Sequence, residues 1–256
     1  MTKKTMLALT CCLLLAACSN NREKITKLEQ IAGKRICVLP GSAGDIAARN
    51  KYPNSDFIVL VGSADAALTV KTGKADVFIY DKSVLQKIIE KNEDLVILEE
   101  PVAKLEVAIA LNKENLSLLS AINNALNVLK DKGILQSLRK KWIDTKYETP
   151  PLFDSTTAVE KKGSLRMGTC AIYEPFSFQS NGKYTGIDIE LSVLIGEHLG
   201  KKIEIIDMAF EGLIPALQSG KIDFALSDFN VTEERKKSIN YSLPYIVNDI
   251  SALVKK

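Results

Sequence analysis

The chain has 256 residues, of which 46% are hydrophobic and 25% charged, and its net charge is +3. This composition is typical of a folded protein with one large or two smaller domains, and it excludes a disordered chain and a small disulfide scaffold. The basic excess is too small for a nucleic-acid surface, so we expect no nucleic-acid partner. His198 is the one histidine, which excludes a multi-histidine metal site. We expect no metal and no cofactor.

The N-terminus has the pattern of an export signal. Lys3 and Lys4 precede an apolar run, Met6 to Ala17, that is too short to span a bilayer. The run leads into Cys18 through Leu-Ala-Ala, which resembles a bacterial lipoprotein signal. The resemblance implies removal of residues 1–17 and acylation of Cys18, and therefore a protein of the bacterial cell envelope, tethered by lipid on the periplasmic or outer side of a membrane. An ordinary secretory peptide with a chance cysteine is the alternative.

Strand and helix patterns alternate along the rest of the chain. The predicted strands lie near residues 35–39, 57–61, 75–80, 95–99, 105–111, 165–169, 202–207, 222–226 and 250–254. The predicted helices lie near residues 43–50, 64–72, 82–91, 114–131, 133–142, 186–199 and 211–219. This alternation is typical of a mixed, mostly parallel α/β architecture. Residues 144–163 contain a Pro-Pro pair and no apolar period, which indicates a linker.

One pattern occurs twice. In residues 63–81 and again in residues 210–228, an amphipathic helix is followed by a glycine stop and a short apolar strand that ends in aspartate. One such unit in each half predicts two similar lobes. Ligands of open α/β sheets bind at the carboxyl ends of strands, so Asp81 and Asp228 are candidate ligand contacts. The alternative is that each acid only caps a following helix.

Two cysteines remain after the signal and the lipid-bearing Cys18. Cys37 lies in a predicted strand and Cys170 lies far along the chain. A disulfide between them is conceivable in an oxidising compartment, but we expect two separate buried thiols. Trp142 lies on an apolar helix face, and we expect it to pack in the core.

The sequence resembles the family 3 periplasmic solute-binding proteins, which serve polar amino-acid ABC transporters. Residues 165–256 are similar to the first half of that family, and the matching motifs are residues 167–178, 186–191, 210–220 and 231–235. Residues 25–143 are similar to the closing half of the family, and the matching motifs are residues 28–35, 40–42, 73–81 and 133–142. The resemblance implies an α/β, two-lobed periplasmic-binding-protein-like fold (type II), with the ligand between the lobes.

The two halves occur in reversed order, because the family runs from lobe one to lobe two and back. We therefore expect a circularly permuted chain, cut at a hinge and ending where the first crossing between lobes would begin. The expected division is 18–29 tether and hinge entry, 30–104 lobe two, 105–143 return to lobe one, 144–163 linker and 164–256 lobe one. The alternative is a pair of half-domains, each completed by another chain or cut from a longer tandem protein. We expect a monomer.

The resemblance implies roles for individual residues. Arg235 matches the arginine that binds the ligand carboxylate, and Asp81 matches the acid that binds the ammonium. Tyr173 and Phe210 match the aromatic pair on either side of the ligand. Ser42 opens a helix whose backbone N–H groups would add to anion binding.

Three candidate residues depart from the family pattern. Cys170 occupies a position where many amino-acid binders have an aspartate, Asp228 replaces the usual glycine, and Asn230 replaces the usual serine or threonine. Asp228 would compete with a ligand carboxylate for Arg235. A basic solute, a solute that is no amino acid, and a cleft that has lost its ligand therefore all stay open.

We expect a lipid-anchored extracytoplasmic protein that captures an amino acid or related small solute by hinge closure and delivers it to an ABC permease and its ATPase. The alternatives are a periplasmic sensor or receptor module with an altered or lost ligand, and an enzyme resembling periplasmic cyclic-acid dehydratases. The candidate cleft contains no histidine and no serine–base pair, and nothing adjacent in sequence would act as a base for Cys170. We therefore expect no enzyme.

Overall fold

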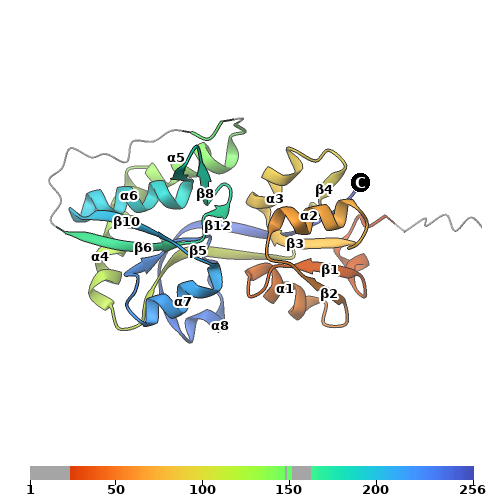
Figure 1. The fold of residues 1–256 in the computed structure, drawn as a ribbon, viewed down its shortest axis with the longest axis horizontal. Helices are drawn as coiled ribbons and strands as arrows, with labels where there is room; N and C mark the ends of the chain where they lie inside the picture. The colour runs from red at the N-terminus through yellow and green to blue at the C-terminus, as the bar shows by residue number, and fades with distance from the viewer. Residues whose placement is uncertain (1–23, 148, 152–162) are drawn as a thin grey trace, which may run out of the picture.

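The structure is a computed structural model that describes residues 24–147, 149–151 and 163–256. These residues form two lobes that lie side by side and share one sheet (Figure 1). The expected signal peptide, Cys18 and most of the expected linker lie outside the described residues. Within the described ranges, no helix combines the length and the apolar character that crossing a membrane requires.

Lobe two contains the elements from residue 28 to residue 97. Its strands are β1 (Arg35–Val38), β2 (Asp56–Val59), β3 (Val77–Asp81) and β4 (Leu95–Ile97). Its helices are η1 (Leu28–Ile31), α1 (Ala43–Lys51), α2 (Ser63–Lys71) and α3 (Lys82–Ile89). Strand β1 pairs in parallel with both β2 and β3, so the helices act as crossovers on the faces of the sheet.

Lobe one is built from two separate parts of the chain. Its sheet strands are β6 (Ser164–Thr169), β10 (Lys202–Asp207) and β11 (Phe224–Ala225), and a separate small sheet holds β7 (Ile172–Tyr173), β8 (Ser177–Ser180) and β9 (Lys183–Thr185). Its helices are α4 (Leu116–Asp131), α5 (Ile134–Arg139), the π-helix η2 (Lys140–Asp144), α6 (Ile187–Leu199), α7 (Phe210–Gln218) and α8 (Glu233–Lys236). Strand β6 pairs in parallel with β10 and β11.

Two long strands, β5 (Ala103–Asn112) and β12 (Ile239–Lys255), connect the lobes. They pair with each other in antiparallel orientation from Ala103 to Asn112. The continuous path of strands is β10-β6-β11-β5-β12-β3-β1-β2, with β4 also paired to β12. The expected boundary near residue 104 therefore lies inside a strand that passes between the lobes.

The expected range 164–256 for lobe one is wrong at its C-terminal end. Residues Ile250–Val254 pair with β3, and residues 253–255 pair with β4, so this half of β12 belongs to lobe two. The side chains of residues 250–254 are buried, and a strand covered on both faces needs a sheet with helices on each side. The crossing consequently lies before these residues, not after residue 256.

The repeated unit forms the same arrangement in both lobes. The Arg35 guanidinium binds Asp76 at 2.7 Å between Nη2 and Oδ1, and the Arg35 backbone N–H donates to the other oxygen of the same carboxylate. Arg166 and Asp223 make the matching pair, also at 2.7 Å, with the matching backbone bond. The start of the first strand is thus fixed to the start of the third in each lobe, which confirms two similar units.

Six predicted helices are confirmed to within two residues at each end, and the one predicted at residues 133–142 is α5 followed by the π-helix η2. The small sheet β7-β8-β9, the short helix α8 and the first half of β12 were missed. These segments mix polar and apolar residues without a clear period, because they lie at the surface or between the lobes. Cys37 and Cys170 are separate buried thiols, as expected. Trp142 is fully buried and donates its ring N–H to Glu190 at 2.7 Å, which confirms its packing role.

Helix α1 rests directly on the backbone of β3, and Gly44 makes this contact possible. A Cβ at Gly44 would overlap the carbonyl group of Ile79. We expect Gly44→Ala to lower the free energy of unfolding by about 1–3 kcal/mol in urea titrations, since the helix must shift. Gly212→Ala is the control, because there the nearest atom is the Met208 sulfur at 3.7 Å. Gly212→Ala should leave the free energy of unfolding unchanged or raise it by up to about 1 kcal/mol. An equal loss of stability in both variants would contradict the close contact at Gly44.

Candidate functional site

The two lobes meet at the carboxyl ends of β3 and β11. The residues that line the cavity there include Ser42, Tyr80, Asp81, Tyr173, Phe210, Asp228, Asn230 and Arg235. Seven of the eight residues expected in the site from the sequence thus lie together. The cavity has a volume of only about 20 Å³, which is room for about one water molecule. The lobes are therefore closed on each other in this structure.

Arg235 is held in an apolar slot. It lies in α8, whose first turn is capped by Thr232, and its guanidinium carbon is 5.1 Å from the ring centres of both Phe210 and Phe229. Its Nη1 donates to the carbonyl of Asn230 and its Nη2 donates to the carbonyl of Gly41, both at 2.9 Å. The second bond crosses from lobe one to lobe two, so Arg235 helps to hold the lobes together.

Asp81 ends β3 and precedes α3, but its side chain makes no capping bond. Its Oδ1 instead accepts hydrogen bonds from the amide of Asn230, at 2.9 Å, and from the amide of Asn248, at 3.0 Å. The capping interpretation is therefore wrong for Asp81. Complete burial raises the pKa of this carboxyl to about 6, against the lowering effect of the two amides and Arg235.

Asp228 lies in a left-handed backbone conformation with φ of 50°. Its backbone N–H donates to Asp188 at 2.9 Å, and the Tyr245 hydroxyl donates to the other oxygen of Asp188 at 2.6 Å. Neither carboxylate oxygen of Asp228 accepts a hydrogen bond from another described residue. No helix begins directly after Asp228, so the capping interpretation is wrong here too.

Three buried carboxyl groups therefore share this region with one arginine. Burial raises the pKa of Asp188 to about 6. Burial raises the pKa of Asp228 well above its usual value, and the nearby Asp81 and Asp188 raise it further. This excess of acid over base favours ligands that carry positive charge.

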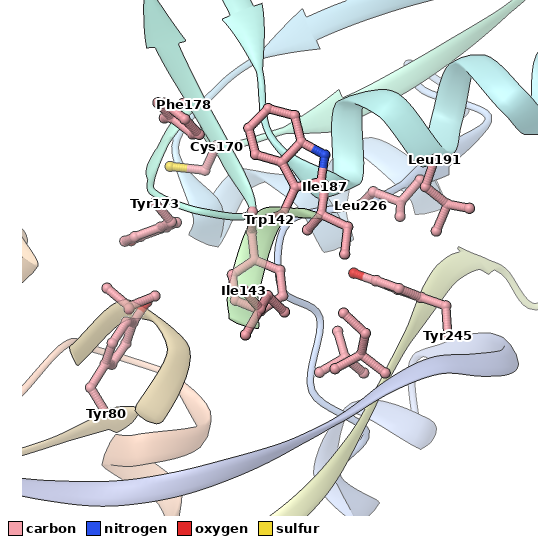
Figure 2. Close-up of a cluster of buried hydrophobic side chains, with 14 of the residues drawn as sticks. Tyr80, Trp142, Ile143, Cys170, Tyr173, Phe178, Ile187, Leu191, Leu226 and Tyr245 are labelled. Atoms are coloured by element: carbon pink, nitrogen blue, oxygen red, sulfur yellow. The ribbon is translucent and has the colours of Figure 1, made fainter. Parts of the chain in front are cut away.

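The expected aromatic pair lines the cavity, but each ring has a second aromatic partner. Tyr173 faces Tyr80 across the lobes, with ring centres 6.0 Å apart (Figure 2). Phe210 stacks on Phe229 at 5.0 Å. Tyr80 and Phe229 were not predicted, although each is adjacent in sequence to a predicted site acid.

Two other supporting residues were also missed. Asp188 lies within a motif that carries the family resemblance, and its role emerges only from its contacts with Asp228 and Tyr245. Asn248 lies in the first half of β12, which gave no strand signal. Its amide reaches Asp81 and its carbonyl oxygen accepts from Ser83 at 3.0 Å.

Ser42 and Cys170 have other local roles. The Ser42 hydroxyl caps α1 by accepting the Asp45 N–H, and the Ser42 backbone N–H donates to Leu39. Cys170 lies beside Tyr173 (Figure 2) and is not among the described residues that line the cavity. Burial raises the pKa of its thiol, which keeps it protonated and argues against a nucleophilic role.

Small-ligand sites occur preferentially at interfaces between domains or lobes, and this cleft combines charged and aromatic groups there. Residues 165–256 match the model of the bacterial extracellular solute-binding proteins, family 3. This part of the chain, which carries Tyr173, Phe210, Asp228 and Arg235, is similar to that family.

The relatives of this chain are named as amino-acid-binding proteins. It is 36% identical over 99 residues to the L-cystine-binding protein TcyJ of Escherichia coli (strain K12), and the aligned segment covers 38% of this chain and 37% of that protein. It is 38% identical over 95 residues to the arginine-binding extracellular protein ArtP of Bacillus subtilis (strain 168), 37% of each chain. Among solved structures, an ancestral arginine-binding protein bound to arginine is 51% identical over 30% of this chain and 34% of that one, with a TM-score of 0.30. The matches thus span little more than a third of each relative.

The buried acids should make the protein less stable at neutral pH than in mild acid. The native state holds the protons of Asp81 and Asp188 up to about pH 6, whereas the unfolded chain releases them near pH 4. We expect the free energy of unfolding to fall as the pH rises from about 4.5 to 6.5, by about 1.4 kcal/mol for each unit of pKa difference. Urea titrations at several pH values measure this. Asp228→Asn should reduce the fall, and a stability that rises over this range would contradict the assignment.

Proposed function

We propose that this chain is a lipid-anchored extracytoplasmic protein that captures an amino acid or related solute between its lobes and delivers it to an ABC permease with its ATPase. The observation that carries this proposal is the position of Arg235 and Asp81 on opposite lobes of one buried cleft. A free amino acid carries a carboxylate and an ammonium, and burying both requires an opposite charge for each. The relatives' names as cystine-, arginine- and histidine-binding proteins support the same class of solute.

Hinge closure is supported by the way the lobes are joined. Strands β5 and β12 pass between them side by side, and the contacts that cross the cleft include side-chain bonds from Asn230 to Asp81 and from Arg235 to the carbonyl of Gly41. The Lys91–Glu174 ion pair, at 3.8 Å, is one of these at the cleft mouth. Such contacts break when the two strands bend, which would admit a solute and let the lobes close over it.

The charge of the site narrows the solute class. Asp81, Asp188 and Asp228 lie in or directly behind the cleft, and Arg235 is the cationic side chain that lines the described cavity. A zwitterion with an additional positive charge would balance this excess better than an acidic or apolar one. Cationic amino acids are therefore the first solutes to test.

The structure also bears on the proposed circular permutation. Each lobe has a sheet in which the first strand lies between the second and third, and β5 and β12 pair within the same chain. A permuted chain would align with its family along one half at a time, and the family model matches residues 165–256. The strand arrangement supports one chain that forms both lobes, and the half-length family match supports a reversed order of the halves.

We expect the soluble protein that starts after Cys18 to be a monomer. If one chain forms both lobes, sedimentation equilibrium should give the monomer mass over the whole accessible concentration range. A dimer that exchanges lobes would contradict the intramolecular arrangement, and mixing chains labelled on different lobes would identify it by energy transfer between them.

Binding is tested first by thermal shift, with the standard amino acids, ornithine, polyamines, small peptides and cyclic carboxylates. A solute at a hundredfold its dissociation constant should add about 2.7 kcal/mol to stability. We expect Arg235→Ala to abolish binding, and Asp81→Ala to weaken ammonium-bearing solutes by about 3–5 kcal/mol in calorimetry. Arg49→Ala is the control, since Arg49 pairs with Asp45 on α1 outside the cavity. Unchanged affinity in both site variants would overturn the assignment.

A further inference from the structure

The charged groups of the cleft are already paired with groups of the protein itself. The guanidinium of Arg235 donates to the carbonyls of Asn230 and Gly41. Asp81 of lobe two accepts from the amide of Asn230, which belongs to lobe one. The Asn230 amide thus takes, on Asp81, the position that a solute ammonium needs. The cavity that these groups line has a volume of only about 20 Å³.

Asp228 adds a second carboxyl group opposite Asp81. The two residues occupy equivalent positions in the repeated units, after the third strand of each lobe, and both line the same small cavity. Both are buried, with 2% and 5% of their surface exposed. Ionising both of two buried carboxyl groups that line so small a cavity is strongly unfavourable, so the pair retains a proton. That proton also supplies the hydrogen bond that no other described residue donates to Asp228.

The groups around this pair do not neutralise it. Arg235 on α8 is a cation, but its two bonded nitrogens are directed to backbone carbonyls. Asp188 on α6 adds a third carboxyl behind Asp228, and the hydroxyl of Tyr245 on β12 donates to Asp188. The hydroxyl-bearing rings of Tyr80 and Tyr173 lie on the cleft side. The pKa values of Asp81 and Asp228 are both raised, in agreement with a retained proton.

We propose that the cleft closes without solute on an internal bridge, in which Asn230 binds Asp81 across the lobes and one proton is shared by Asp81 and Asp228. Removing the proton leaves two facing carboxylates whose repulsion opens the lobes. A solute ammonium that replaces the Asn230 amide supplies the missing positive charge, and the shared proton then leaves to solvent. Asn230 and the proton on Asp228 therefore compete with the solute ammonium for Asp81.

The test measures lobe closure in the absence of any solute. Leu68→Cys and Ile172→Cys place spin labels at two exposed positions on opposite sides of the cleft mouth, and Cys37 and Cys170 are buried. We expect strong dipolar broadening at pH 5 that is lost as the pH rises to 8. Asn230→Ser should lose the broadening at pH 5 already, and Asp228→Asn should keep it at pH 8.

Asn240→Ser is the matched control, because the Asn240 amide binds the carbonyl of Lys113 outside the cleft. It should behave like the parent. Circular dichroism checks that each variant is folded, and Asn230→Thr replaces Asn230→Ser if that variant is not. Two results would overturn the proposal. One is equal broadening in the Asn230 variant and the parent at pH 5. The other is loss of broadening in Asp228→Asn over the same pH range as in the parent. Because no solute is present, this result is independent of the binding assay for the proposed function.

Discussion

The antiparallel pairing of β5 with β12 is the interaction on which the rest of the structure depends. Each strand contributes to both lobes, so the two sheets become one continuous path. The pairing also brings Asn248 of β12 to the edge of the cleft, where its amide binds Asp81 and its oxygen accepts from Ser83. Movement of the hinge strands and the position of the cleft acid are therefore mechanically connected.

The cleft combines this mechanical constraint with an electrostatic one. Burial makes every unpaired charge expensive, and the closed lobes bury three carboxyl groups and one guanidinium. The guanidinium is stabilised by two aromatic faces and two carbonyls. The acids have fewer partners, and burial raises their pKa values.

Much of this arrangement was predictable from the sequence. The repeat located Asp81 and Asp228 at the ends of equivalent strands, since an apolar run followed by an acid marks where a buried strand meets solvent or ligand. The departure of Asp228 and Asn230 from the family pattern marked them as unusual. Their contacts were not predictable, because a hydrogen bond from Asn230 to Asp81 joins residues 149 positions apart. Asn248 was missed because β12 begins with polar residues and a proline, a pattern that does not distinguish a strand from a loop.

The position of the second half of β12 also constrains how the molecule is made. Strand β12 lies between β3 and β4 in the sheet of lobe two, whose other strands are all translated before residue 98. Lobe two is therefore the first to be synthesised but cannot complete its sheet until residues 250–255 have been added. Its contacts join distant parts of the chain, which slows folding. Until residues 250–255 have been synthesised, the edge of β3 that pairs with β12 lacks its neighbouring strand.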